Sequence, residues 1–387
     1  MDFSLTPKQQ EVYDLVEELG RHQFASAAAQ HDRDATLPLD NLAVLARHGL
    51  LGLTVGRDLG GHDSGVMGSD PLLYLLAIEQ TARFCLATAQ CLHIHCHGAH
   101  LIDRISEKSQ RKRVLEPVVG DGALLNVTGS EPGQTARGFF NYSTVAARTQ
   151  TGYVLNGKKA YATLASGVSY NIVFAGVDGM SPPDSHIGFL VPPGAAGLFI
   201  DKKSWDPMGM RGAASPNMLL TDCFVADENV IAPPGSIPRQ RWQAKFQLSF
   251  AAQYVGAAQG IFDFLLRYLP KRGTTGDSYT QLRLGEIAIG IEAARCMMHR
   301  AAWLWQAKRT TEAEVYTIGA KRQAIESASV AMDKAARIAG PSAFTAAGEF
   351  SRMFRDLRVQ TLHENPDKAS GTVGRAHLGL EYDTTAR

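Results

Sequence analysis

The sequence lacks paired cysteine motifs and long hydrophobic runs. Its 387 residues include five cysteines, an odd number with no CxxC pair, which argues against a disulfide framework or a zinc ribbon. No window of about 18 apolar residues occurs, as a membrane-spanning helix would require. The first residues do not combine a charged segment with an apolar one, so we expect no signal peptide. Together these absences favour a cytoplasmic protein with reduced cysteines.

An excess of charge of one sign is also missing. Lys and Arg together number 39 and Asp and Glu 38, which gives a net charge of +1. Nucleic-acid binding depends on clustered positive charge, so we expect no nucleic-acid partner, and no membrane partner either. The chain also has no GxGxxG motif after a first strand, which disfavours a classical dinucleotide-binding fold.

The first third of the chain, residues 1–122, has helical periodicity. Thr6 and Pro7 form a typical helix start, and the residues that follow predict a helix over 5–20. The same reasoning predicts helices over 38–49, ending at Gly49, and over 71–104. We therefore expect an N-terminal helical domain.

The middle of the chain, residues 123–235, changes to short β-like segments. Residues 142–148 and 152–155 predict a hairpin, and Asn156-Gly157 predicts a turn into a further strand. From about residue 240, helical periodicity returns over 246–269, 281–308 and 312–338, and the tail after Gly371 is weakly patterned. Helices followed by a β-layer and a four-helix bundle make an α+β fold, with a β-barrel or sandwich at 123–235 and the bundle at 236–387.

Three local motifs suggest a binding site. Residues 127–135 (VTGSEPGQT) form a Gly-containing loop whose backbone N–H groups can bind carbonyl or anionic groups. Residues 156–163 (NGKKAYAT) place an aromatic ring and a hydroxyl on the same side of a predicted strand. Residues 205–215 (WDPMGMRGAAS) place Arg211 between glycines, which suits a phosphate. Each also has a simpler interpretation: a turn, a surface hairpin, or an arginine paired with a structural carboxylate.

In this order, the motifs resemble those of the acyl-CoA dehydrogenase superfamily, over nearly the whole chain. The resemblance implies FAD, bound at an interface between subunits of a homotetramer or homodimer. The positions that it places at FAD are, in this sequence, Val127, Thr128, Ser130, Tyr161, Thr163, Arg211, Ser215, Arg272 and Gly340. Several motifs depart from the family pattern: Tyr161 stands for a Trp, the family's Gly-Ser-Asp falls on 135–137, and Arg272 is only a rough match to its phosphate-binding arginine.

The resemblance leaves two reactions open. Glu364 aligns with the base that abstracts a proton from a CoA thioester in the dehydrogenases of the family. The segment around His363 is similar to that of the flavin mono-oxygenase branch, in which reduced flavin reacts with O₂ and His363 could serve as a proton donor. Because of the departures from the family pattern, we favour oxygenation of a CoA thioester or similar acyl substrate over α,β-dehydrogenation. A non-catalytic scaffold that has lost the cofactor is a third alternative.

Four histidines cluster between residues 93 and 100. His93 and His97 share a helical face and could bind a metal ion. No third ligand completes a known pattern such as HExxH, so we interpret the cluster as packing or pocket residues and expect no metal.

Overall fold

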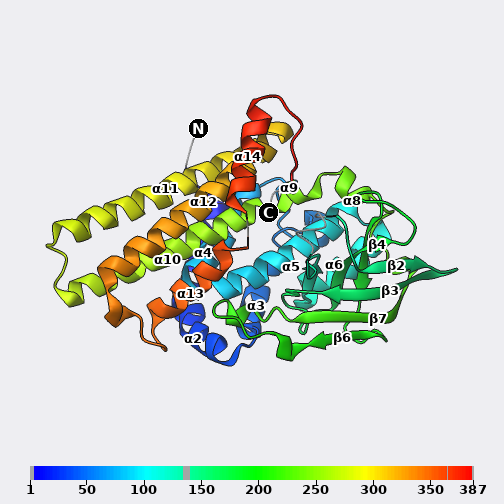
Figure 1. Cartoon of the computed structure of the whole chain (residues 1–387), viewed down its shortest axis with the longest axis horizontal. Coiled ribbons are helices and arrows are strands. Elements are labelled where there is room, and N and C mark those ends of the chain that lie inside the picture. Colours follow the sequence, from blue (N-terminus) through cyan, green and yellow to red (C-terminus); the bar gives the residue numbers. More distant parts are fainter. Residues whose placement is uncertain (1–3, 134–139, 364, 386–387) are drawn as a thin grey trace.

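The computed structural model describes residues 4–133, 140–363 and 365–385 of the chain. Helices make up both ends of this region, and the strands lie between them in sequence (Figure 1). The first group of helices is α1 (Pro7–Leu19), α2 (Ala25–Asp34), α3 (Leu39–Arg47), α4 (Pro71–Phe84), α5 (Leu86–Ile105) and α6 (Lys108–Asp121). The last group is α8 (Ser236–Arg239), α9 (Trp242–Phe246), α10 (Leu248–Arg272), α11 (Ser278–Gln306), α12 (Thr310–Ala339), α13 (Glu349–Thr361) and α14 (Pro366–His377).

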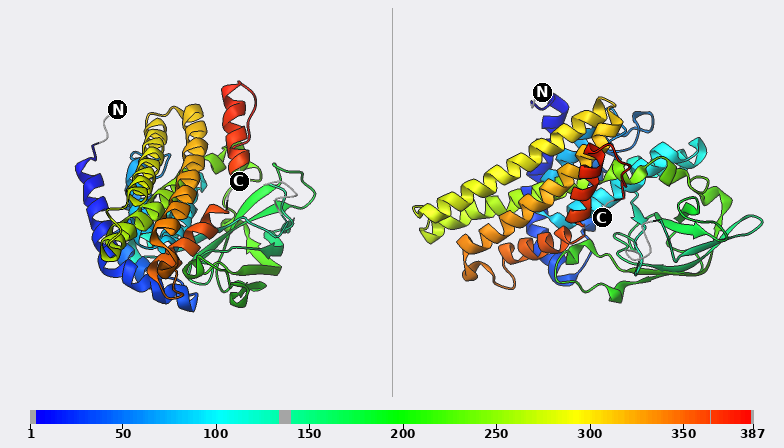
Figure 2. Two further views of the ribbon diagram at one scale, coloured as in Figure 1. Left: turned by 60° about the vertical axis from the view of Figure 1, so that its left-hand side comes forward. Right: turned by 45° about the horizontal axis from the view of Figure 1, so that its top comes forward.

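The described strands form one curled sheet. They are β1 (Leu125–Thr128), β2 (Val145–Arg148), β3 (Gly152–Lys159), β4 (Tyr170–Val177), β5 (His186–Val191), β6 (Leu198–Asp201) and β7 (Asn217–Ala226). The strand order is β1-β4-β2-β3-β7-β6, and β5 pairs with β4. Figures 1 and 2 show the sheet on one side of the molecule and the long helices on the other, which confirms the predicted α+β architecture.

Local signals at the helix ends are confirmed. The Thr6 hydroxyl accepts a hydrogen bond from the backbone amide of Gln9, and the Gln9 side-chain oxygen accepts one from the backbone amide of Thr6. The two residues therefore form a capping box at the start of α1. Gly49 follows α3 in a left-handed conformation, φ 72°. The predicted single helix over 71–104 is wrong, because Cys85 adopts an extended conformation, φ −152° and ψ 101°, and separates α4 from α5. The weakly patterned tail is helical as far as His377.

The hairpin prediction is confirmed in part. Strands β2 and β3 pair antiparallel, but Asn156-Gly157 is not a turn: it lies inside β3, where the register against β7 shifts between Leu155 and Gly157. Asn156 stays in the sheet because its side chain bonds Asp222 in both directions, at 3.0 and 2.8 Å. The dipeptide is therefore a β-bulge.

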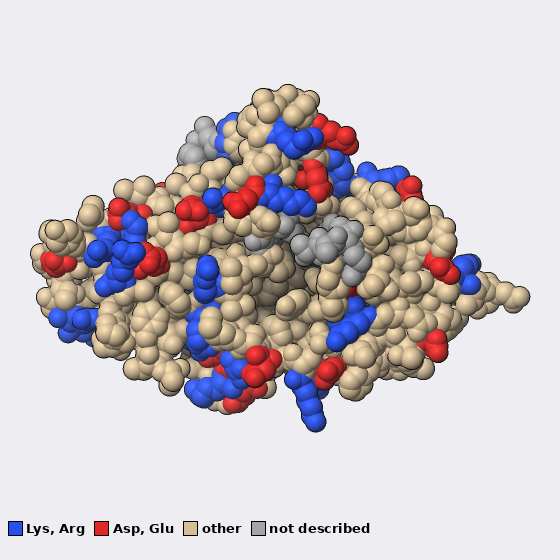
Figure 3. Space-filling model, in the orientation of Figure 1, with Lys and Arg blue, Asp and Glu red and all other residues tan. Residues whose placement is uncertain are grey.

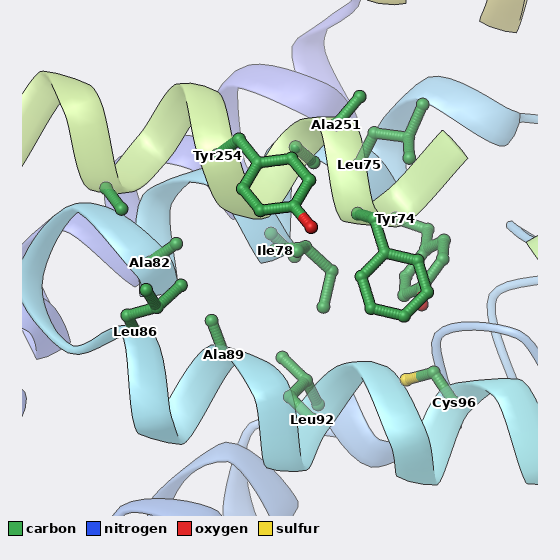
Figure 4. Packing of buried hydrophobic residues seen from close by; sticks show 14 of the residues in the cluster. Tyr74, Leu75, Ile78, Ala82, Leu86, Ala89, Leu92, Cys96, Ala251 and Tyr254 are labelled. Carbon is green, nitrogen blue, oxygen red and sulfur yellow. The ribbon is translucent and has the colours of Figure 1, made fainter. Parts of the chain in front are cut away.

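Helix α4 packs against α10, so it joins the bundle formed by the last group of helices. A Cβ atom at Gly256 of α10 would lie 2.0 Å from the Glu79 carbonyl oxygen, and one at Gly260 would lie 2.2 Å from that of Arg83. These two glycines therefore allow α10 to lie close against α4. Figure 4 shows the apolar core at this junction, where Tyr74 and Ile78 of α4 face Leu92 of α5 and Tyr254 of α10.

Candidate functional site

Strand β1 carries Val127 and Thr128 and joins the sheet to the helices. It runs parallel to β4, and the Leu125 amide donates a hydrogen bond to Nδ1 of the buried His95 on α5, at 3.1 Å. Gly98 of α5 lets the strand approach, because a Cβ there would lie 3.3 Å from the Val127 side chain. The Thr128 hydroxyl accepts the Asn126 side-chain amide. Helix α5 therefore fixes the position at which the chain leaves β1.

A buried ion pair holds the loop after β1. The Glu131 carboxylate accepts the Lys159 ammonium at 2.7 Å, and both side chains are inaccessible to solvent. It also accepts the backbone amides of Ser143 and Thr144, at 2.6 and 3.0 Å. Burial alone would raise the pKa of Glu131, but the adjacent Lys159 charge and these hydrogen bonds outweigh it and hold the pKa at about 2. Glu131 is thus a permanent anion that organises the loop.

The motif at 156–163, the second of the three, contacts the first (127–135) and the third (205–215) directly. The Ala160 amide donates to the Ser130 carbonyl at 2.9 Å, and the Ala162 amide donates to the Pro216 carbonyl at 2.9 Å. The hydroxyls of Thr163 and Ser215, from the second and third motifs, lie 2.7 Å apart in the interior. The three segments that the sequence singled out therefore converge.

Tyr161 and Thr163 do not lie on a strand, so the predicted strand geometry is wrong. Strand β3 ends at Lys159, and the Thr163 amide donates to the Tyr161 carbonyl in a tight turn. Tyr161 adopts a left-handed conformation, φ 56°, and the residue is 69% exposed while Thr163 is buried. The turn therefore presents an exposed aromatic ring next to the buried Thr163–Ser215 hydroxyl pair.

Arg211 is engaged by protein groups. Its Nε donates to the Asp32 carbonyl at 2.8 Å and its Nη1 to the Asp206 carboxylate at 2.7 Å. The Trp205 indole donates to the Arg211 carbonyl at 2.9 Å. Two of the donor atoms of Arg211, Nε and Nη1, are therefore occupied by protein groups, as the simpler interpretation of a structural arginine predicts.

The middle of α13 holds the third motif in place. The Met210 amide donates to the Asp356 carboxylate at 2.6 Å, and Arg355 bonds both the Met208 carbonyl and the Asp32 carboxylate. Burial raises the pKa of Asp356 to about 6, although Arg352 and the Met210 amide act to lower it. The motif is thus fixed between α2 and α13.

Arg272 and Gly340 lie together, but apart from the other predicted residues. Arg272 ends α10 and donates a hydrogen bond to the Ala339 carbonyl, and Gly340 follows α12 directly. Figure 1 shows these helix ends on the side of the molecule away from the sheet. Within one chain, the structure therefore does not bring them to the three converging motifs.

His363 follows α13 and packs against α10. Its ring centre lies 5.1 Å from that of Phe250, and His93 of α5 lies 4.4 Å from the same ring. The His93 Nδ1 atom is within hydrogen-bond distance of the hydroxyls of Tyr74, at 3.1 Å, and Ser249, at 2.8 Å. Glu364, the predicted base, lies outside the described residues.

The other histidines of the cluster are also buried. His97 accepts a hydrogen bond from the Trp242 indole at 3.2 Å and stacks on Phe246 at 3.8 Å between ring centres. Burial lowers the pKa of His95 and of His100 to about 4, so both are neutral at pH 7. Among the described residues, no group of three or more His, Cys, Asp or Glu could hold a metal ion.

The face that carries these elements is hollowed. Figure 3 shows a central depression between the long helices and the sheet, below α14.

Sequence reasoning missed Lys159, which is 28 residues from its partner Glu131 and lies on another element. It also missed the Tyr74–His93–Ser249 contacts, which join three helices. No local spacing could have indicated either set.

No helix of the described chain is long and apolar enough to cross a membrane.

Comparison with known proteins identifies the family. The acyl-CoA dehydrogenase N-terminal domain matches residues 6–121, and the acyl-CoA dehydrogenase C-terminal domain matches residues 246–366. The short-chain specific acyl-CoA dehydrogenase of Clostridium acetobutylicum is 26% identical over 384 residues, covering 96% of this chain and 98% of that enzyme.

Solved structures share the whole fold. Glutaryl-coenzyme A dehydrogenase, in complex with glutaryl-CoA, superposes with a TM-score of 0.90 at 21% identity, covering 100% of this chain and 98% of that one. The dibenzothiophene monooxygenase TdsC of Paenibacillus sp. A11-2 superposes with a TM-score of 0.85 at 20% identity, covering 97% and 99%. The chain belongs to the acyl-CoA dehydrogenase superfamily and is a flavin-dependent oxidoreductase with that fold.

Proposed function

We propose that this enzyme uses FAD and O₂ to oxygenate a CoA thioester or a similar acyl substrate. The observation that carries the proposal is that the imidazoles of His93 and His363 both pack against the ring of Phe250. Imidazole exchanges protons near neutral pH. Oxygenation requires FAD already reduced by an external electron donor, and it uses two electrons from that flavin and two protons to convert one oxygen atom of O₂ into water. The monooxygenase TdsC has the same fold as this chain, so the fold is compatible with an oxygenation reaction.

The converging motifs fit a flat ring system with polar edges. Tyr161 offers an exposed aromatic face, and the Thr163 and Ser215 hydroxyls can each donate and accept hydrogen bonds. We assign the flavin ring to these residues together with Val127, Thr128 and Ser130, and a phosphate to the remaining donors of Arg211. Bound FAD would supply two-electron transfer, either from the acyl chain or, once reduced, to O₂.

The imidazoles would hold and deliver the protons. Burial raises the pKa of the Tyr74 hydroxyl well above its ordinary value, so Tyr74 stays protonated beside His93. The Tyr74–His93–Ser249 contacts then fix the His93 ring in place. His363, directly after α13, is exposed to solvent. We assign His363 as the proton donor and the buried His93 contacts as its support.

Dehydrogenation with Glu364 as the base is the second candidate. It is favoured by the 26% identity to a short-chain specific acyl-CoA dehydrogenase over nearly the whole chain. The C-terminal domain of the family ends its match at residue 366, just after this position. A carboxylate there would take the α-proton of the thioester.

Isotope-labelled O₂ distinguishes the two reactions. Oxygenation predicts labelled oxygen in the product; unlabelled product with a new double bond would establish dehydrogenation instead. Glu364→Gln should abolish dehydrogenation and spare oxygenation, whereas His363→Gln should slow oxygenation by at least about a hundredfold, the usual contribution of general acid catalysis. His377→Gln, at an exposed histidine of α14, is the matched control and should leave turnover unchanged.

We further propose that the enzyme is a homotetramer or homodimer in which Arg272 and Gly340 contact the FAD of a partner subunit. Their distance from the sheet within one chain supports this (Figure 1). We also propose the domain boundaries 1–122, 123–235 and 236–387, because the strands lie between the two groups of helices along the chain. Arg272→Gln should lower the FAD content of the purified oligomer, and unchanged FAD affinity would contradict the assignment.

A further inference from the structure

A cavity lies between α2 and the start of α13, next to the third motif, because Asp32 in its lining accepts a hydrogen bond from Arg211. Its volume is about 300 Å³. The methyl groups of Ala25, Ala29, Ala346 and Ala347 form its apolar walls, and Asp32, Arg33, Gly348, Glu349 and Arg352 complete its lining. None of the residues predicted at the flavin site contributes to it.

Arg352 is buried at this cavity with its donors unused. Its side chain is 7% exposed, and an arginine carries five N–H donors. Among the described residues, none accepts a hydrogen bond from this guanidinium; its nearest carboxylate oxygen, Asp356 Oδ2, is 3.8 Å away. These donors line the cavity, and only this distant carboxylate offsets their charge, so the position points to an anionic ligand.

The backbone at the same place adds further donors. Helix α13 begins at Glu349, and no side chain caps it. The first amides of a helix have no partner within the helix and carry partial positive charge. Glu349, whose amide is the first of these, lines the cavity, so this helix end lies at the same cavity as Arg352.

The other charges of the lining favour a single negative charge on the ligand. Asp32 is paired with Arg355 and Glu349 with Arg267. Arg33 bonds the neutral Gln30. Two guanidinium groups are therefore available, but two carboxylates remain close by and would repel a dianion such as phosphate.

We propose that this cavity binds a small organic monocarboxylate. The carboxylate would accept two parallel N–H bonds from Arg352, the geometry that guanidinium favours, and a short apolar body would lie against the alanine walls. The cavity adjoins the proposed flavin site through Asp32, whose carbonyl accepts Arg211, but the proposal does not depend on which of the two reactions the enzyme performs.

Calorimetric titration of the purified FAD-bound oligomer with hexanoate tests the proposal. We expect saturable binding of hexanoate and no binding of hexan-1-ol, since a charge-assisted hydrogen bond carries the affinity. Inorganic phosphate should bind at least about tenfold more weakly, because it has no apolar body to lie against the alanine walls and the two carboxylates repel its dianion. Arg352→Met should weaken hexanoate binding by at least about tenfold, and Arg352→Lys should restore part of it. Arg358→Met, at an exposed arginine of the same helix, is the matched control and should bind as the unchanged protein does.

Three results would overturn the proposal. Hexanoate that fails to saturate the unchanged protein shows that no such site exists. Binding that survives Arg352→Met at full strength shows that hexanoate occupies another place, such as the acyl site of the enzyme. Phosphate that binds as tightly as hexanoate excludes the monocarboxylate class. If Arg352→Met does not fold, Arg33→Gln replaces it, because Arg33 is exposed and its loss should still weaken hexanoate binding several-fold.

Discussion

The backbone amide of Met210 donates a hydrogen bond to the carboxylate of Asp356 across 146 residues of sequence. Asp356 is 3% exposed, and it belongs to α13, whereas Met210 belongs to the motif that supports the proposed flavin site. The bond therefore makes the position of this motif depend on α13, and it places a titratable group at the connection.

Asp356 predicts a pH dependence of stability. Its pKa in the folded protein is about 6, above about 3.9 for an unfolded aspartate. The folded protein thus binds this proton more tightly, so the contribution of Asp356 to stability is present at low pH and is lost as the pH rises through about 6. The difference of about two pKa units corresponds to about 3 kcal/mol.

Asp356→Asn isolates this contribution, because the amide oxygen can still accept the Met210 bond. The free energy of unfolding in urea, measured for both proteins between about pH 4 and 8, should fall more steeply with pH in the unchanged protein. Parallel curves would show that Asp356 does not titrate in this range.

The Glu131–Lys159 pair predicts the opposite dependence. The pKa of Glu131 is about 2 in the folded protein, below about 4.3 for an unfolded glutamate, so its stabilising contribution is present above that value and is lost as the pH falls through about 2. Lys159→Met should cost about 3–5 kcal/mol, because it leaves a buried carboxylate without its partner. Urea unfolding at pH 7 measures this loss.

The double variant Glu131→Gln/Lys159→Met should recover part of that cost, since no uncompensated charge remains. Arg239→Met breaks a pair whose side chains are 58% and 66% exposed, and it should cost less than about 1 kcal/mol. Equal losses at the buried and the exposed pair would contradict the role of burial.

Tyr161 predicts a separation of stability from cofactor binding. A left-handed backbone conformation costs a residue with a side chain about 1 kcal/mol or more, and glycine adopts it freely. Tyr161→Gly should therefore leave the stability of the FAD-free protein within about 1 kcal/mol of its original value and yet weaken FAD binding. Fluorescence titration with FAD measures the affinity, and Tyr161→Phe, which keeps the ring, should bind nearly as well as the unchanged protein.

The sequence predicted those features whose signals are local. Thr6, Pro7 and Gln9 lie within one turn of helix, and their side chains alone determine where α1 begins. The break at Cys85 carries no such signal, because neither glycine nor proline occurs between 72 and 97. It depends instead on packing, as α4 must lie against α10 while α5 lies against β1.

The sequence indicated the three motifs, but it did not indicate which groups their side chains bond in the folded protein. Arg211 bonds Asp32, which is 179 residues away, and the Glu131–Lys159 pair joins a loop to a strand. Partners this distant are set by the folded arrangement, so residue spacing indicates which segments meet and not which atoms bond. The left-handed turn at Tyr161 was missed for a related reason: an alternating pattern predicts a strand, and tertiary hydrogen bonds from Ala160 and Ala162 replaced it.

Two glycines of the bundle predict opposite effects of the same substitution. Gly256→Ala should destabilise the protein by about 3 kcal/mol or more, because the new Cβ would lie 2.0 Å from the Glu79 carbonyl oxygen and force α10 away from α4. Gly285→Ala in α11 should instead stabilise it by up to about 1 kcal/mol, because a Cβ there meets no atom within 4 Å and alanine is the better helix former. Thermal unfolding of both variants makes the comparison, and an equal response would mean that α4 and α10 are not in close contact. Since α4 also carries Tyr74, which contacts His93, Gly256→Ala should slow turnover as well, whereas Gly285→Ala should leave it unchanged.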